Sequence, residues 1–105
     1  MSTRTSRDRA IRRVVIRGRV QGIGYRVWTE REAQLRSIEG WVRNRRDGSV
    51  EAVFAGTPNA VAGMIEACWQ GPALAHVEAI DAQEASAADL GERRLSDKFS
   101  LLPTV

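Results

Sequence analysis

Apolar and polar residues alternate along much of this chain with a period close to two, which is the pattern of strands with one buried face. Residues 11–19 follow it imperfectly and predict a first strand. Two further runs, residues 38–44 and 49–56, flank the pair Asp47 and Gly48. An Asp-Gly pair between two strand-like runs is typical of a β-hairpin, so these runs are expected to lie side by side.

A different period, close to that of a helix, governs two other segments. Residues 25–36, YRVWTEREAQLR, are predicted to form a helix mainly because these residue types favour one. The apolar face of this helix is thin. We expect it to consist of Tyr25, Trp28 and Leu35, with Ala33 adding little.

The second helix, within TPNAVAGMIEACWQGP, has stronger signals. Thr57 can cap it, Pro58 suits its first position, and the Gly71-Pro72 pair is expected to end it. Apolar residues recur at helical spacing and predict its buried stripe: Val61, Met64, Ile65 and Cys68. Cys68 is therefore expected to be a core residue and not a nucleophile.

The remainder of the chain predicts one strand at residues 75–85, a polar loop at 86–98, and a short last strand within 99–105. The resulting order, βαββαβ, predicts an α+β fold of the ferredoxin-like kind, an antiparallel sheet with two helices on one face. Because that architecture serves enzymes, RNA-binding modules and regulatory domains alike, function has to come from particular residues.

Length, composition and charge limit the classes of protein to which this chain can belong. A length of 105 residues suggests one domain, here residues 11–105, preceded by a flexible basic arm at residues 1–10. A single cysteine and a single histidine exclude a disulfide within the chain and a Cys/His zinc site, and they favour the cytoplasm. No apolar run is long enough to cross a bilayer, so no membrane association is expected. The net charge of +3 is compatible with an anionic partner.

The stretch GRVQGIGYR, residues 18–26, is the main candidate for chemistry, and we call it the glycine loop. Glycines allow successive backbone N–H groups to turn toward one point, and the loop leads into the first turn of a helix, whose free N–H groups attract anions. Arg26 lies in that turn, where the helix dipole alone disfavours a cation. An anion bound between the loop and Arg26 would make the position of this cation favourable. A tight turn with a solvated Arg26 is the alternative, and from this loop alone both remain open.

Two motifs together resemble a known family. GRVQGIGYR followed, after a helix, by EGWVRNRRDGSVEAVFAG is similar to the loop and the Gly-Trp-Val-Arg-Asn segment of the acylphosphatases, and the resemblance covers residues 14–56 well. It implies an enzyme that hydrolyses the carboxyl–phosphate bond of a small-molecule acyl phosphate, giving a carboxylate and inorganic phosphate, without metal or cofactor. In these terms Arg26 binds the phosphate and Asn44 orients the attacking water.

The resemblance also implies that backbone amides of the loop bind the phosphate. These are the amides of Val20, Gln21, Gly22, Ile23, Gly24 and Tyr25. Chemistry agrees with the proposal, because phosphoryl transfer depends mostly on positioning and on stabilising charge on the equatorial oxygens. A carboxylate leaves as a stable anion, so neither motif needs a general acid, and neither contains a histidine.

The chain departs from the family pattern at Arg36 and Ser37, which stand where an apolar residue and a helix-ending glycine are usual. We expect this to affect the packing or the cap of the first helix more than activity.

Two alternatives remain open at this point. A non-catalytic anion- or RNA-binding module would account for the basic charge, although the first strand lacks the aromatic residues on which RNA bases stack. An acylphosphatase-like domain of a larger carbamoyl-phosphate-handling protein is the other, and the chain length argues against it. The default expectation is a monomer with no specific nucleic-acid partner.

Overall fold

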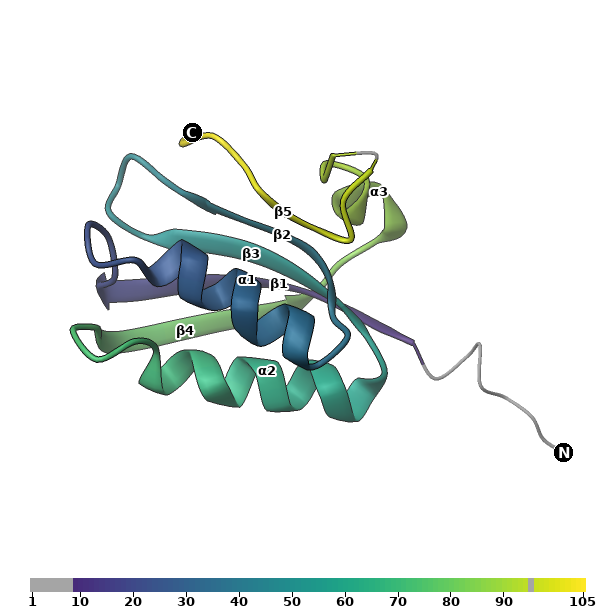
Figure 1. Ribbon diagram of the computed structural model, residues 1–105, viewed down its shortest axis with the longest axis horizontal. Coiled ribbons are helices and arrows are strands. Elements are labelled where there is room, and N and C mark those ends of the chain that lie inside the picture. Colours follow the sequence, from purple (N-terminus) through teal and green to yellow (C-terminus); the bar gives the residue numbers. More distant parts are fainter. Residues whose placement is uncertain (1–8, 95) are drawn as a thin grey trace, which may run out of the picture.

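The structure is a computed structural model that describes residues 9–94 and 96–105, and Figure 1 shows how its elements are arranged. In chain order they are β1 (Ala10–Arg19), α1 (Tyr25–Leu35), β2 (Glu39–Asn44), β3 (Val50–Gly56), α2 (Pro58–Gln70), β4 (His76–Glu84), α3 (Ala87–Leu90) and β5 (Phe99–Leu101). All the strands and both main helices predicted from the sequence are present. The predicted ferredoxin-like α+β fold is confirmed.

The strands form one sheet in the order β4-β1-β3-β2-β5. Both β1 and β2 pair with β3 in antiparallel fashion, so β1 and β2 run in the same direction and their carboxyl ends lie at the same end of the sheet.

The prediction of a fully antiparallel sheet was wrong at the outer strand β5. This strand pairs with β2 in parallel. The chain reaches this edge after crossing the sheet by way of α3, and it therefore arrives running in the direction of β2.

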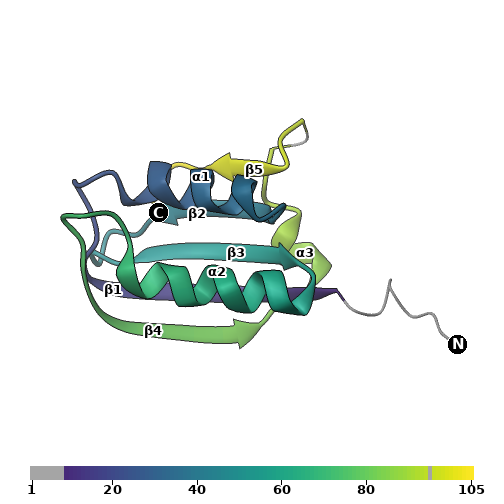
Figure 2. The ribbon, with the colours of Figure 1, turned by 60° about the horizontal axis from the view of Figure 1, so that its bottom comes forward.

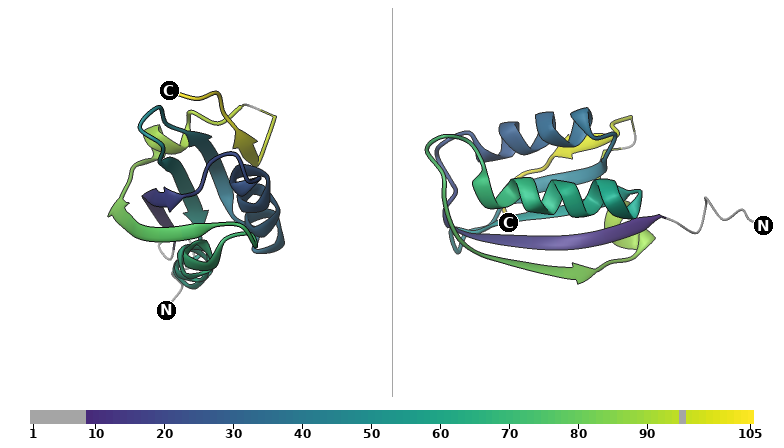
Figure 3. Two further views of the ribbon diagram at one scale, coloured as in Figure 1. Left: turned by 90° about the vertical axis from the view of Figure 1, so that its left-hand side faces the viewer. Right: turned by 90° about the horizontal axis from the view of Figure 1, so that it is seen from below.

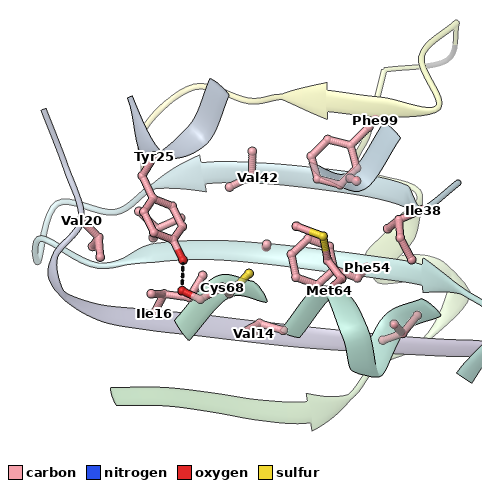
Figure 4. Close-up of a cluster of buried hydrophobic side chains, with 14 residues drawn as sticks. Val14, Ile16, Val20, Tyr25, Ile38, Val42, Phe54, Met64, Cys68 and Phe99 are labelled. Carbon is pink, nitrogen blue, oxygen red and sulfur yellow. Dashed lines mark hydrogen bonds between the residues drawn. The ribbon is translucent and has the colours of Figure 1, made fainter. Parts of the chain in front are cut away.

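Helices α1 and α2 lie side by side on one face of the sheet (Figure 2). The core between them and the sheet is built from buried side chains of β1, β2, β3 and both helices, as Figure 4 shows. The predicted stripe of α2 is part of it, since Val61, Met64 and Cys68 are buried and Ile65 packs against the same cluster. Thr57 caps α2 as expected, accepting a hydrogen bond from the N–H of Ala60.

The predicted buried face of α1 was partly wrong. Leu35 is 79% exposed, whereas Ala33 is completely buried together with Tyr25 and Thr29. These three residues are four apart and so lie on one side of the helix. Thr29 can be buried because its hydroxyl donates to the carbonyl of Tyr25, 2.8 Å away, and small residues at 29 and 33 let the helix approach the sheet closely.

The opposite face of the sheet is partly covered, around Trp41 and Val53, which the sequence did not predict. The segment expected to be a plain loop contains α3, a single turn closed by a capping box between Ser86 and Asp89. Leu90 of this turn packs against Trp41 and Leu102 in a second buried cluster. The indole N–H of Trp41 donates to the carbonyl of Asp89, 2.7 Å away, and holds the turn on the sheet.

Most of the predicted basic arm, residues 1–10, lies outside the described residues. Of its last two positions, Ala10 already belongs to β1, and Arg9 forms an ion pair with Glu39 at 2.9 Å. Within the described part of the chain, no helix is both long and apolar enough to cross a membrane.

The departure at Ser37 lies at the end of α1. Ser37 has φ 57°, the left-handed conformation that glycine adopts most easily. Its N–H donates to the carbonyl of Gln34 at 3.2 Å, and the N–H of Ile38 donates to that of Ala33 at 2.8 Å. This is the Schellman pattern of helix termination, formed here with a serine in the position that favours glycine.

Replacing Ser37 with glycine is therefore expected to stabilise the protein by about 0.5–1 kcal/mol, because it removes the cost of a Cβ in the left-handed region. Urea unfolding of wild type, Ser37→Gly and Ser37→Ala would measure this. The alanine variant keeps the Cβ and should gain nothing. A glycine variant that unfolds at lower urea concentration than wild type would contradict the expectation.

Candidate active site

A cavity of about 100 Å³ lies where the glycine loop meets the end of β2. The loop after β1 and the turn between β2 and β3 lie at the same end of the molecule, which faces the viewer in the left panel of Figure 3. Its lining residues come from the loop, from the first turn of α1 and from β2: Val20, Gln21, Gly22, Gly24, Tyr25, Arg26, Val27 and Asn44. Since a water occupies about 30 Å³ in the liquid, this cavity has room for a small oxyanion.

Two glycines give the loop its shape. Gly22 has φ 75° and Gly24 has φ 82°, while the residue between them has no positive φ. A Cβ added at either glycine would meet nothing within 4 Å, so backbone conformation, and not lack of space, requires glycine at these positions. When residues with positive and negative φ alternate, as they do from Gly22 to Gly24, neighbouring N–H groups turn toward one side. This is the backbone arrangement of anion-binding nests.

The backbone N–H groups of residues 22–27 donate to no acceptor among the described residues. The first intrahelical bond of α1 comes from Trp28, whose N–H donates to the carbonyl of Gly24 at 3.0 Å. Gly24 caps the helix without any side-chain hydrogen bond. The positive end of α1 and a row of free donors therefore lie beside the cavity, an arrangement that favours a bound anion.

Arg26 adds a full positive charge to this end of the helix. It lines the cavity from the first turn of α1, which contains no acidic residue. None of the ion pairs found among the described residues involves Arg26. Other arginines do have carboxylate partners: Arg13 on β1 and Arg43 on β2 both pair with Glu51. The helix dipole disfavours a cation at this position, and an anion bound beside Arg26 would offset that unfavourable interaction.

Asn44, the last residue of β2, lines the same cavity. Its side-chain Oδ1 is buried, and within residues 9–94 and 96–105 it has no hydrogen-bond partner. A buried polar atom without a partner is costly and is uncommon in folded proteins, which makes Asn44 a candidate for interaction with a group bound in the cavity.

The start of α1 is held firmly. The hydroxyl of Tyr25 donates to the carbonyl of Cys68 at 2.6 Å, a bond drawn in Figure 4, and this ties the first residue of α1 to the last turn of α2. Burial raises the pKa of Tyr25 well above its ordinary value, so the phenol stays protonated and remains a donor. Burial also raises the pKa of Cys68 to about 12, which keeps the thiol neutral and makes it a poor nucleophile.

The turn after Asn44, residues 45–49, is closed by its own hydrogen bonds. Both the hydroxyl and the backbone N–H of Ser49 donate to the carboxylate of Asp47, at 2.6 and 2.9 Å, and lower the pKa of Asp47 to about 2. Asp47 is therefore an anion at neutral pH with a structural role in the turn. The C-terminal segment contacts the same region, because the N–H of Val105 donates to the carbonyl of Asn44 at 3.1 Å.

The structure brings the residues singled out in the sequence to one place, with one difference. Arg26, Asn44 and the predicted amide positions line the cavity except for Ile23, whose side chain packs against the core. Sequence reasoning missed Val27, which lines the cavity at the next position of the helix, and the side chain of Gln21, described below. Among the described residues no three His, Cys, Asp or Glu side chains gather as a metal site would require.

The ferredoxin-like sheet, with a glycine loop of free N–H groups beside a small cavity, defines a small α+β protein. The acylphosphatase family model matches residues 12–98. An acylphosphatase from Bradyrhizobium diazoefficiens is 57% identical over 93% of this chain and 99% of that protein. The chain belongs to the acylphosphatase family and is an enzyme.

Solved acylphosphatase structures have the same fold as this chain. The acylphosphatase from Coxiella burnetii superposes with a TM-score of 0.81, at 27% identity, over 96% of this chain and all of that one. The acylphosphatase from Bacillus subtilis superposes with a TM-score of 0.75, at 35% identity, over 88% of this chain and 97% of that one. The similarity therefore extends through the C-terminal half, where the sequence motifs alone did not reach.

Proposed function

We propose that this acylphosphatase binds the phosphate of a small-molecule acyl phosphate with Arg26 and the loop amides, while Asn44 orients the attacking water. The observation that carries the proposal is the convergence of three features on one cavity: an arginine without a carboxylate partner, a row of free N–H groups, and the end of β2 bearing Asn44. Each feature suits one part of phosphoryl transfer to water.

Charge on the transferring phosphoryl group spreads over three equatorial oxygens. The free N–H groups and the guanidinium of Arg26 can donate to those oxygens, and they need no rearrangement during the reaction because the loop already has its shape. A guanidinium also offers two parallel donors, which fits two oxygens of one phosphate.

The side-chain amide of Asn44 can hold a water molecule by a hydrogen bond, but it cannot take a proton from it. In this mechanism it fixes the water in line with the carboxyl–phosphate bond, and a phosphate oxygen of the substrate receives the proton. The carboxylate then leaves as an anion, without help from an acid.

The RNA-binding alternative is not favoured. Ferredoxin-like RNA binders use an open sheet face with exposed aromatic side chains. Here α3 and Leu102 cover part of that face, and Trp41, the aromatic residue beneath them, is completely buried. We propose instead a monomeric cytoplasmic enzyme whose partner is its small substrate; the free thiol of Cys68 fits a reducing compartment.

Release of phosphate from benzoyl phosphate tests the activity. We expect hydrolysis that is unchanged by EDTA, together with hydrolysis of para-nitrophenyl phosphate at least about 10²-fold slower, because its leaving group is poorer and the cavity offers no acid. Activity lost in EDTA and restored by a divalent metal would contradict the mechanism. Inactivity toward benzoyl phosphate combined with tight, salt-sensitive RNA binding would support the alternative.

A further inference from the structure

The side chain of Gln21 connects the two halves of the candidate site. Its amide nitrogen donates to the carbonyl of Arg45 at 2.8 Å and to the carbonyl of Ser49 at 2.7 Å. Its backbone belongs to the glycine loop, so a single residue joins the loop to a turn more than twenty positions away in the sequence. Both amide hydrogens are used, which only Gln or Asn among the neutral side chains can provide.

The two acceptors are the carbonyls that close the turn after Asn44. Arg45 follows Asn44 directly, and its N–H donates to the carbonyl of Ser49 at 2.9 Å. Ser49 precedes Val50, which pairs with Asn44 at the end of the β2–β3 ladder. Gln21 therefore holds the turn at the point where it fixes the position of the Asn44 backbone.

Neither side of the site is rigid by its covalent structure alone. The loop contains Gly22 and Gly24, the turn contains Gly48, and all three have positive φ. Displacement by about 1 Å between a bound group and its attacking partner can lower a rate by about 10²-fold. A specific link between loop and turn is therefore worth more to catalysis than its two hydrogen bonds are to stability.

We infer that Gln21 is a positioning residue that acts through Asn44. By fixing the turn relative to the glycine loop, it sets the distance and direction from which the water held by Asn44 meets the phosphorus. It does not itself contact the reacting atoms with its side chain. This inference rests on the proposed roles of Arg26 and Asn44, and it adds a role that the backbone amide of Gln21 does not have.

Gln21→Met tests it, because methionine has nearly the same length and lacks the two donors. We expect kcat for benzoyl phosphate to fall at least about 10-fold, while the inhibition constant of inorganic phosphate changes by no more than about threefold. Gln21→Glu should be worse than Gln21→Met, since a carboxylate facing two carbonyls repels them. Gln34→Met, on the exposed side of α1, is the matched control and should behave as wild type.

A double-mutant cycle separates positioning from general damage. If Gln21 acts through Asn44, adding Gln21→Met to Asn44→Ala should lower kcat little further, by less than about threefold. Independent, multiplying losses would overturn the inference, as would a loss confined to phosphate affinity or a Gln21→Met enzyme with wild-type kcat. In those cases an active wild type leaves the proposed function intact, whereas an inactive wild type overturns both.

Discussion

Replacing Arg26 with alanine is expected to lower kcat/KM for benzoyl phosphate by at least about 10³-fold, the scale on which an arginine supports phosphoryl transfer. The guanidinium is the only full positive charge among the residues that line the described cavity. Without it, the charge on the phosphoryl oxygens would be balanced by backbone N–H groups and the helix dipole alone, which together carry only a partial charge.

Arg26→Lys distinguishes charge from geometry. Lysine keeps the charge but donates from one point, so we expect it to recover only a small part of the activity. The inhibition constant of phosphate should rise in both variants. Arg31, exposed on the same helix, provides the control, and Arg31→Ala should stay close to wild type. Near-normal kcat/KM in Arg26→Ala would remove Arg26 from the mechanism.

Replacing Asn44 with alanine is expected to lower kcat by roughly 10²–10³-fold with little change in the inhibition constant of phosphate. The reason is that Asn44 holds the water and not the phosphate, so its loss affects the reacting complex and not the binding of the product. Asn59→Ala, at an exposed position near the start of α2, is the control. Weakened phosphate binding at unchanged kcat would show that Asn44 has a different role.

The free energy of unfolding of Asn44→Ala gives a second test of the role of Asn44. Because Oδ1 of Asn44 is buried without a partner in the described chain, removing it relieves a desolvation cost. The free energy of unfolding of Asn44→Ala should therefore equal or exceed that of wild type, as urea denaturation would show. A variant that is both less active and no less stable is the signature of a residue kept for function. Clear destabilisation would instead point to a structural role in the hairpin.

Local patterns were enough to predict most elements. The Asp47-Gly48 pair predicts the β2–β3 hairpin, and the Thr57-Pro58 pair predicts the start of α2, because each acts through backbone geometry within a few residues. The face of α1 was harder to predict. Which of its faces is buried depends on how the helix is rotated against the sheet, and that rotation made Ala33 a core residue and left Leu35 in solvent.

The structure of the chain beyond β4 was even harder to predict from local patterns. A polar segment gives no local signal that Leu90 will cover Trp41, or that β5 will run parallel to β2, because both contacts join residues far apart in sequence. The hydrogen bonds from Gln21 to Arg45 and Ser49 could not be predicted from the spacing of residues either. A single glutamine gives no sequence pattern that indicates its partners.

The sequence by itself determined the chemistry of each half of the site: glycines that shape a loop of free N–H groups, an arginine at a helix start, and an asparagine at a strand end. The resemblance of the paired motifs implied that these halves act together, and only the tertiary structure showed how they meet. They do so because β1 and β2 both pair antiparallel to β3, which makes both strands end at the same edge of the sheet. Strand order is set by long-range packing, and no local pattern in the sequence records it.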